Sequence, residues 1–175
     1  MLSETVYLAL GANLGNRAET LRRAVAALGD VVTVTATSAA YETEPAYVFD
    51  QPRFYNLALA AETTVGPYAL LRVLKSIEAE LGRRPGVRYG ARAIDLDILL
   101  FGDVIMDTPD LTVPHARLAE RPFVLAPLAE IAPLLVVPGT HQTVAELFAA
   151  LGDVSAQAWS RGPLATLDLD QEAEA

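Results

Sequence analysis

Hydrophobic residues recur along the chain at two spacings, which distinguish expected strands from expected helices. Alternating or continuous apolar runs, rich in valine, threonine and leucine, predict strands over residues 5–10, 31–41, 54–63 and 93–101. Apolar residues three or four positions apart predict two helices. One follows Asn16, a residue type suited to an N-cap, and ends at Gly29; the other runs from Pro67 to Gly82.

These elements follow one another as β-α-β-β-α-β, which predicts an α+β fold of the ferredoxin-like kind. In that fold an antiparallel sheet carries both helices on one face. Two more short helices, expected over residues 114–128 and 143–151, would cover the other face and give three α-β-α layers. We expect residues 1–160 to form a single domain and the acidic residues 161–175 to form a disordered tail.

Three loops connect these elements, and they cover residues 11–16, 42–53 and 82–91. They are rich in glycine, proline and charge and have little apolar anchorage, so we expect them to be mobile. We also expect them to close over bound substrates and to exclude water from the reacting groups.

Composition narrows the range of functions. At 175 residues the chain suits one domain with a sizeable core, and no apolar run is long enough to span a membrane. The N-terminus has no basic region typical of a signal peptide, so a cytoplasmic protein without a membrane partner is expected. The net charge of −9 argues against nucleic acid as a partner. We expect a monomer that binds small molecules.

The absence of cysteine excludes disulfides and thiolate metal sites, so any metal must be held by carboxylates or by His115 and His141. Twelve of the thirteen basic residues are arginines, and four of these crowd into residues 83–92. The positive charge is therefore concentrated locally, which suits an anionic ligand such as a phosphate.

The most unusual local pattern places Arg92, Asp95 and Asp97 in an otherwise apolar segment. Period-2 alternation puts Ile94, Leu96, Ile98 and Leu100 on one face of the expected strand and both aspartates on the other. Two carboxylates at this spacing are typical of a magnesium site that is completed by water and substrate phosphates, and Arg92 could bind such phosphates. A solvated strand face, with no metal, would give the same Asp-x-Asp pattern.

Seven segments together resemble the 6-hydroxymethyl-7,8-dihydropterin pyrophosphokinase family of folate biosynthesis. They are GANLG at 11–15, YETEP at 41–45, QPRFYN at 51–56, IEAELGR at 77–83, RAIDLDILL at 92–100, LTVPH at 111–115 and RPFVLAPL at 121–128. The resemblance covers roughly residues 5–150, and the order and spacing of the segments are those of the family.

The resemblance implies that the chain transfers pyrophosphate from ATP to the hydroxymethyl group of the pterin and releases AMP. Asp95 and Asp97 would bind two magnesium ions, and Arg83 and Arg92 would act with them in catalysis. The ATP-binding residues would be Glu78, Arg83, Arg92, Ile98, Thr112, His115 and Arg121. This agrees with a reaction that depends on positioning and charge neutralisation.

The resemblance also implies a pocket for the flat pterin. Phe54 and Phe123 would stack on its ring, Asn56 would bind its polar edge, and the main chain at Thr43 and Ala46 would contribute. An asparagine in an apolar strand supports this, because a buried amide needs hydrogen-bonding partners. Plain core packing remains the alternative for both phenylalanines.

The sequence departs from the family pattern at several positions. Ala91 and Glu44 each stand where the family commonly has a proline, and Tyr89 replaces a tryptophan seen in some members. Ala46 offers only a small side chain. Asp110 and Ala116 replace a basic and an aromatic residue of some members.

Two other functions stay open on the residues alone: another magnesium-dependent nucleotidyl or phosphoryl transferase, and a non-enzymatic nucleotide- or metabolite-sensing domain. An RNA-binding domain is disfavoured by the excess of acidic residues.

Overall fold

The sheet at the centre of the fold is assembled from strands that present one face to each of two hydrophobic cores. The computed structural model describes residues 2–86 and 88–167. Its strands are β1 (Glu4–Ala12), β2 (Val32–Thr37), β3 (Tyr41–Thr43), β4 (Phe54–Thr63), β5 (Asp95–Phe101) and β8 (Ala158–Ser160), with a separate hairpin of β6 (Met106–Asp107) and β7 (Thr112–Val113). All the pairings in the sheet are antiparallel, in the order β5-β1-β4-β3-β8, and β2 also pairs with β4.

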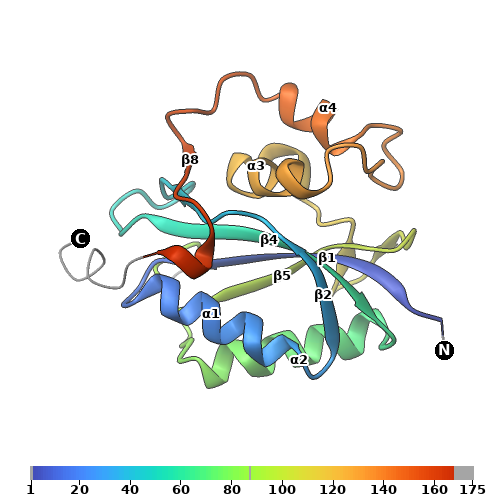
Figure 1. Ribbon diagram of the computed structural model, residues 1–175, viewed down its shortest axis with the longest axis horizontal. Coiled ribbons are helices and arrows are strands. Elements are labelled where there is room, and N and C mark those ends of the chain that lie inside the picture. Colours follow the sequence, from blue (N-terminus) through green and yellow to red (C-terminus); the bar gives the residue numbers. More distant parts are fainter. Residues whose placement is uncertain (1, 87, 168–175) are drawn as a thin grey trace.

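Helices cover both faces of the sheet, as Figure 1 shows. Helices α1 (Arg17–Leu28) and α2 (Pro67–Glu80) lie on one face, and α3 (Pro122–Ile131) and α4 (Val144–Ala149) lie on the other. Two single-turn 3-10 helices, η1 (Leu118–Glu120) and η2 (Leu164–Thr166), complete the described elements. The predicted α+β class with an antiparallel sheet and helices on both faces is confirmed.

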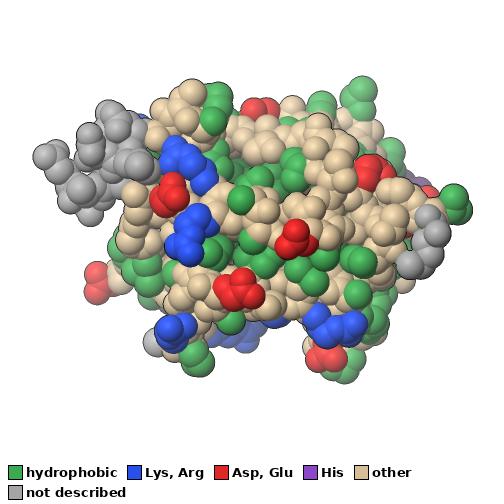
Figure 2. All heavy atoms as spheres, turned by 60° about the horizontal axis from the view of Figure 1, so that its bottom comes forward, with side chains coloured by type: hydrophobic (Ala, Val, Ile, Leu, Met, Phe, Trp, Pro, Cys, Tyr) green, Lys and Arg blue, Asp and Glu red, His purple; other side chains and the backbone are tan. Residues whose placement is uncertain are grey.

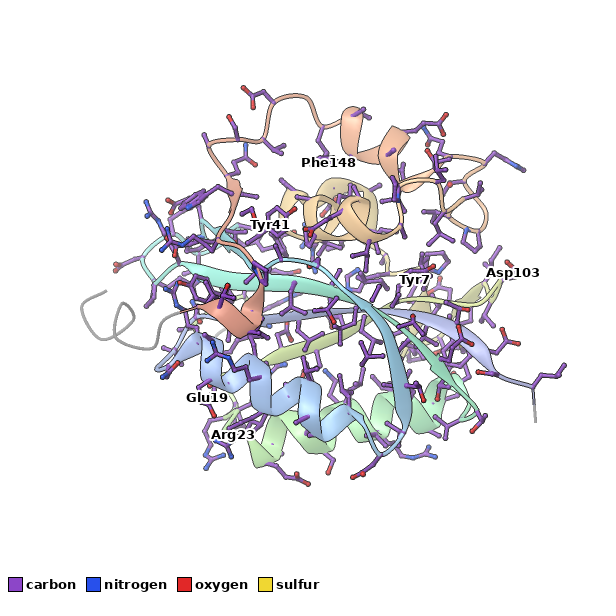
Figure 3. The ribbon with its side chains drawn as sticks, viewed as in Figure 1. Tyr7, Glu19, Arg23, Tyr41, Asp103 and Phe148 are labelled. Carbon is purple, nitrogen blue, oxygen red and sulfur yellow. The ribbon has the colours of Figure 1, made fainter. Side chains whose placement is uncertain are left out.

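Side-chain alternation divides the interior into two cores. On β4, Tyr55, Leu57 and Leu59 point toward α1 and α2, whereas Ala58 packs under α3. Figure 3 shows Tyr7 and Tyr41 on the α3 side of the sheet and Phe148 between α4 and α3, while Glu19 and Arg23 lie on the outer side of α1. The sheet is therefore buried on both faces, and side chains on its α3 side are packed except where a cavity opens.

The outer surface of α1 and α2 has the mixed character of a solvated helix face. Figure 2 shows charged side chains of both signs scattered among hydrophobic and uncharged groups on this side of the molecule. Each helix has one buried stripe, which includes Leu21 and Leu28 in α1 and Leu70 and Leu74 in α2. No helix among residues 2–86 and 88–167 is long and apolar enough to cross a membrane.

The strand predicted over residues 31–41 is divided into β2 and β3. The hydroxyl of Ser38 accepts a hydrogen bond from the main-chain N–H of Ala58, and the N–H of Ala39 donates to the carboxylate of Glu130. These side chains replace the regular ladder partners, so the strand is interrupted at this point. The break shifts the register, and Tyr41 then pairs with Asn56.

The helix predicted over residues 114–128 begins later than expected. Residues 114–117 form a turn after a cis peptide bond between Val113 and Pro114, and η1 follows. Helix α3 starts at Pro122, a residue that fits the first helical turn because it needs no N–H partner there. The helix predicted over 143–151 is α4, which Thr143 and Glu146 cap reciprocally.

The C-terminal segment packs further than the predicted domain boundary at residue 160. Strand β8 pairs with β3, and the buried side chain of Leu164 joins the core beside α1. Arg22 on α1 donates hydrogen bonds to the carbonyl oxygens of Leu164 and Leu167, at 2.8 and 2.7 Å. The domain thus extends at least to Leu167. The predicted disorder of the acidic residues 168–175 falls outside the described residues.

We expect Leu57→Ala to lower the free energy of unfolding by about 2–5 kcal/mol, because it removes a fully buried side chain from the central strand. Chemical denaturation measures this loss. Leu134→Ala is the matched control, since Leu134 is 82% exposed and its truncation should change stability by less than about 0.5 kcal/mol. Equal losses for the two variants would contradict the assignment of the core.

Candidate functional site

Two carboxylates project from β5 into a cavity on the α3 side of the sheet. The alternation of β5 buries Leu96 and Ile98 against α1 and α2, which places Asp95 and Asp97 on the opposite face. The cavity has a volume of about 260 Å³. Eleven residues that the sequence singled out line it: Thr43, Ala46, Phe54, Asn56, Arg83, Arg92, Asp95, Asp97, His115, Arg121 and Phe123.

Both oxygens of Asp95 are bound by guanidinium groups. Arg83 Nη1 lies 2.7 Å from Asp95 Oδ1, and Arg92 Nη1 lies 3.2 Å from Asp95 Oδ2. Arg92 comes from the loop that enters β5, and Arg83 lies just beyond the end of α2. The arginine cluster predicted to bind phosphate is thus anchored on a carboxylate predicted to bind metal.

Asp97 has no such cationic partner within 3.5 Å among the described residues, and its nearest basic group is His115, 4.0 Å away. Burial raises the pKa of Asp97 to about 7, and the neighbouring carboxylate of Asp95 adds to the rise. The 30% of its side-chain surface that stays exposed faces the cavity. Two carboxylates that repel each other in a protein-lined cleft are suited to binding a cation.

His115 is held as a neutral hydrogen-bond donor. Burial lowers its pKa to about 4, and the guanidinium of Arg121 adds to the fall. The main-chain N–H of Arg117 donates to Nδ1 of His115 at 3.2 Å, so the ring proton of the neutral imidazole resides on Nε2. This Nε2–H group points toward Asp97 and is available to an anionic ligand.

Glu78, Ile98 and Thr112, three residues expected at an ATP site, do not line this cavity. Glu78 is buried, accepts a hydrogen bond from the N–H of Leu96 at 2.8 Å and pairs with Arg83. It lines a second, adjoining hollow of about 540 Å³ that shares Arg83, Arg92 and Lys75 with the first.

Ile98 points away from the cavity, because the same alternation that exposes the aspartates buries its side chain in the core beside α2. The hydroxyl of Thr112 donates to Asp107 within the β6–β7 hairpin. Any contact of these two residues with a ligand would therefore have to come through the main chain.

The far end of the cavity is aromatic. Phe54 and Phe123 face it from β4 and α3, and Asn56 lies two residues beyond Phe54 on the same strand. Asn56 Nδ2 donates to Thr43 Oγ1 at 2.7 Å, and its side-chain oxygen has no hydrogen-bond partner among residues 2–86 and 88–167. An amide with unused polar atoms beside two aromatic rings is suited to a flat, hydrogen-bonding ligand.

Gly11 makes this shared cavity possible. It lies in β1 directly between its partners Asn56 on β4 and Asp95 on β5. A Cβ atom at this position would lie 2.4 Å from Asn56 Oδ1 and 3.8 Å from Phe54. The missing side chain therefore leaves room that joins the aromatic end to the carboxylate end.

The three loops expected to be mobile are tied together above the cavity. Asn13, which is 2% exposed, donates from Nδ2 to Gln51 Oε1 and accepts from the N–H of Arg92 at its own Oδ1, at 2.9 and 2.8 Å. Gln51 Nε2 in turn donates to the carbonyl oxygen of Tyr89 at 2.8 Å. These bonds hold the loops in one arrangement, and their mobility stays a prediction.

Sequence reasoning assigned no role in the site to five residues that line the cavity: Gly11, Glu44, Tyr47, Lys75 and Tyr89. Lys75 is the only lysine of the chain, and it projects from α2 toward Glu78 at 3.2 Å. Two signals for these residues were present in the sequence: Lys75 is a single lysine among many arginines, and Gly11 follows directly on an apolar strand. Nothing local indicated that Tyr47 faces the cavity.

The chain resembles proteins of known family over most of its length. The model of the 7,8-dihydro-6-hydroxymethylpterin-pyrophosphokinase family matches residues 7–133. A Bacillus subtilis protein named 2-amino-4-hydroxy-6-hydroxymethyldihydropteridine pyrophosphokinase is 49% identical over 132 residues, which are 74% of this chain and 79% of that protein. A Pseudomonas aeruginosa protein of the same name is 43% identical over 150 residues, 84% of this chain and 91% of that protein.

Longer proteins match as well. The mitochondrial folate synthesis bifunctional protein of Pisum sativum is 48% identical over 129 residues, and this chain spans only 25% of its length. A crystal structure of a triple mutant of Plasmodium falciparum HPPK-DHPS with pteroate has the same fold, with a TM-score of 0.71 at 15% identity over 91% of this chain and 47% of that one.

We expect Asp97→Asn to stabilise the protein at pH 8 when metal is removed with a chelator. The pKa of Asp97 is raised from about 3.9 in the unfolded chain to about 7 in the fold, so its ionisation costs stability progressively as the pH rises through this window. The gain should be on the order of 1–4 kcal/mol at pH 8 and should vanish near pH 4, as measured by denaturation at both values. Asp103→Asn, which alters an exposed residue in the turn after β5, is the control. A loss of stability for Asp97→Asn at pH 8 would contradict the desolvation of this carboxylate.

Proposed function

The chain belongs to the 7,8-dihydro-6-hydroxymethylpterin-pyrophosphokinase family, and we propose that it transfers the β,γ-pyrophosphate of ATP to 6-hydroxymethyl-7,8-dihydropterin. The hydroxymethyl oxygen of the pterin attacks the β-phosphorus, and AMP leaves. The reaction belongs to folate synthesis, the process named for several relatives.

One observation carries the proposal: a single cavity has a charged end and an aromatic end that meet at Gly11. Asp95, Asp97, Arg92 and His115 lie at the charged end, and Phe54, Asn56 and Phe123 at the other. A reaction between a polyphosphate and a flat heterocycle needs both ends in one enclosure, because proximity and orientation supply much of the rate. Another metal-dependent transferase would leave the aromatic end without a purpose.

Asp95 and Asp97 would hold magnesium, with two ions expected. The residues present fit this role, because both carboxylates line the same cavity and magnesium needs only one or two carboxylates beside water and phosphate. When bound, magnesium neutralises charge on the phosphates and polarises the phosphorus that is attacked.

The arginines have a second task once nucleotide binds. Arg83 and Arg92 occupy Asp95 in the free site, so they are already positioned where the metal-bound phosphates would lie. We infer that they exchange this carboxylate for phosphate oxygens, which guanidinium groups bind in the same planar geometry. Arg121 and the Nε2–H group of neutral His115 add donors on the other side of the phosphates.

The aromatic end would orient the pterin. Phe54 and Phe123 offer ring faces, and Asn56 offers one acceptor and one remaining donor hydrogen to the edge of the heterocycle. Thr43 holds the Asn56 amide in place, and Ala46 leaves space at the wall. Glu78 steadies the charged end from below, through its contacts with Arg83 and the N–H of Leu96.

Several finer predictions belong to this proposal. The core strand order β5-β1-β4 with β2 and β3 at its edge supports the ferredoxin-like topology. A monomer that acts in the cytoplasm on small molecules alone, without nucleic acid or membrane partners, stays a prediction. The net charge of −9 argues against a nucleic-acid partner.

The proposal predicts AMP formation from ATP, magnesium and 6-hydroxymethyl-7,8-dihydropterin, followed by chromatography of the nucleotides. Asp95→Ala and Asp97→Ala should each lower kcat at least about 100-fold, because each removes a metal-binding carboxylate. Asp103→Ala, which truncates an exposed aspartate in the turn after β5, should retain full activity. Absence of AMP with the unaltered protein would reject the proposed function.

Gly11→Ala should raise the KM for the pterin and lower kcat, each by roughly tenfold or more, because the added methyl group displaces Asn56. The control is Gly66→Ala: a Cβ at Gly66 meets no atom within 4 Å, and its φ of −75° suits alanine. Steady-state kinetics of both variants make the comparison. If the two variants behaved alike, the close approach of Asn56 to β1 would have no part in binding the pterin.

A further inference from the structure

Residues 157–162, which we call the edge segment, form the outer edge of the sheet beside the aromatic end of the cavity. Figure 1 shows the chain crossing from α4 on one face of the sheet to η2 beside α1 on the other, with β8 between them. Because β8 pairs with β3, the short strand β3 is an inner strand of the sheet. The edge segment lies beyond residues 7–133, the part of the chain that matches the family model.

Main-chain hydrogen bonds hold the edge segment against the strand that forms one wall of the cavity. Thr43 pairs with β4 on one side and with Ala158 of the edge segment on the other. The N–H of Glu44 donates to the carbonyl oxygen of Gln157 at 3.2 Å. Thr43 and Glu44 line the cavity, and Thr43 Oγ1 accepts the hydrogen bond that orients the Asn56 amide. The edge segment therefore helps to determine where this wall lies.

The side chain of Arg53 joins the edge segment to the end of β3. Its guanidinium carbon lies 5.0 Å from the centroid of the Trp159 ring. Arg53 Nε lies 2.7 Å from Glu44 Oε1, and Arg53 Nη1 lies 3.6 Å from Glu42 Oε1. Glu42 and Trp159 are direct partners in the pairing of β3 with β8. One guanidinium thus contacts an aromatic ring of the edge segment and two carboxylates at the end of β3.

Helix α1 anchors the same cluster. The guanidinium carbon of Arg17, a buried residue at the start of α1, lies 3.8 Å from the Tyr55 ring centroid, and Arg17 Nη1 donates to the carbonyl oxygen of Arg53 at 2.9 Å. Arg17 Nη2 also lies 3.6 Å from Glu42 Oε2. Because Thr43 faces the cavity, alternation along β3 directs Glu42 to the α1 side. Neither Glu42 nor Arg53 lines the cavity, so they can influence a ligand there only through the strand.

The indole ring of Trp159 gives the guanidinium of Arg53 a fixed place. The Arg53 side chain is 52% exposed, and an exposed ion pair is weak by itself because water screens it. An indole face is the best aromatic partner for a cation, so Trp159 holds the guanidinium beside both glutamates. Arg53 in turn lessens the repulsion between the carboxylates of Glu42 and Glu44.

We propose that the edge segment is a positioning element for the pterin, with Trp159 and Arg53 as positioning residues; this rests on the proposed function. Cross-strand pairs stabilise a strand, and pairing with β4 alone would support the short strand β3 on one side only. With β3 held between two strands, the Thr43 hydroxyl and the Asn56 amide stay where they meet the polar edge of the heterocycle. The metal-binding carboxylates lie on β5, at the opposite end of the sheet order, and do not depend on β8.

Trp159→Ala tests the role of the ring. At saturating MgATP we expect the KM for the pterin to rise roughly three- to tenfold, as for loss of one cation–π contact. The KM for MgATP and kcat should change by less than about twofold, because the wall binds the pterin equally before and during the reaction and the phosphate-binding residues lie on other elements. Trp159→Phe keeps an aromatic face and should restore most of the affinity. Tyr68→Ala removes a half-exposed aromatic residue that bonds Thr108, and it is the control.

A double-mutant cycle tests whether Trp159 acts through Arg53. Arg53→Gln removes the cation and its ion pairs, so we expect the KM for the pterin to rise roughly three- to tenfold. Addition of Trp159→Ala should then raise this KM by less than about twofold further, because the indole has no cation left to hold. Arg72→Gln, at an exposed arginine of α2, is the matched control and should leave every constant unchanged. If the two single effects multiplied, Trp159 would act independently of Arg53 and the proposal would be wrong.

A merely structural role for the edge segment would give a different result. It would lower the Tm and the active fraction, and so kcat, without raising the KM for the pterin. That outcome would overturn the proposal, as would an equal rise in the KM for MgATP and for the pterin. If the unaltered protein forms no AMP, the proposed function fails and this inference fails with it. If the unaltered protein forms AMP and Trp159→Ala has an unchanged KM for the pterin, only this inference fails.

Discussion

The site depends on one constraint of strand β5: the side chains that must be buried and those that must stay polar alternate. Burial of Leu96 and Ile98 in the core beside α1 and α2 forces Asp95 and Asp97 to the other face, where α3 closes a cavity over them. Neither carboxylate can move to solvent without pulling an apolar side chain out of the core. The fold therefore offsets the cost of keeping both carboxylates in the cavity: burial raises the pKa of Asp97, and the neighbouring charge of Asp95 adds to the rise.

Strand β1 lies between the strands that carry the two ends of the cavity: β5 carries the two aspartates, and β4 carries Phe54 and Asn56. Gly11 pairs with Asn56 on one side and with Asp95 on the other. Any larger residue would separate the aromatic end from the carboxylates, since a Cβ would lie 2.4 Å from Asn56 Oδ1. One backbone position without a side chain thus determines whether the two ends form one cavity or two.

Local sequence patterns predicted most of this arrangement, and the exceptions depended on distant contacts. The strands, the first two helices and the outward direction of Asp95 and Asp97 follow from alternation and capping, which act over a few residues. The division of the strand at Ser38 depends on Ala58 and Glu130, far along the chain, and so does the pairing of β8 with β3. For Ile98 the alternation predicted a buried side chain, which the structure has, and the place at the ATP site that the family resemblance implied stays a prediction. Arg53 and Trp159 meet only in three dimensions.

The free site is close to electrically balanced. Arg83, Arg92 and Lys75 pair with Asp95 and Glu78 in one network of ion pairs, while Asp97 and Arg121 line the same cavity outside this network. A bare polyphosphate would compete with Asp95 for the arginines, and bare metal ions would compete with the arginines for Asp95. A polyphosphate and its magnesium ions carry charges that nearly cancel. When they bind together, the arginines exchange Asp95 for phosphate oxygens, and Asp95 exchanges the arginines for a metal ion. Because charge separation is costly in a cleft of low dielectric, this balance favours substrates that bind as a metal–nucleotide complex over either component alone.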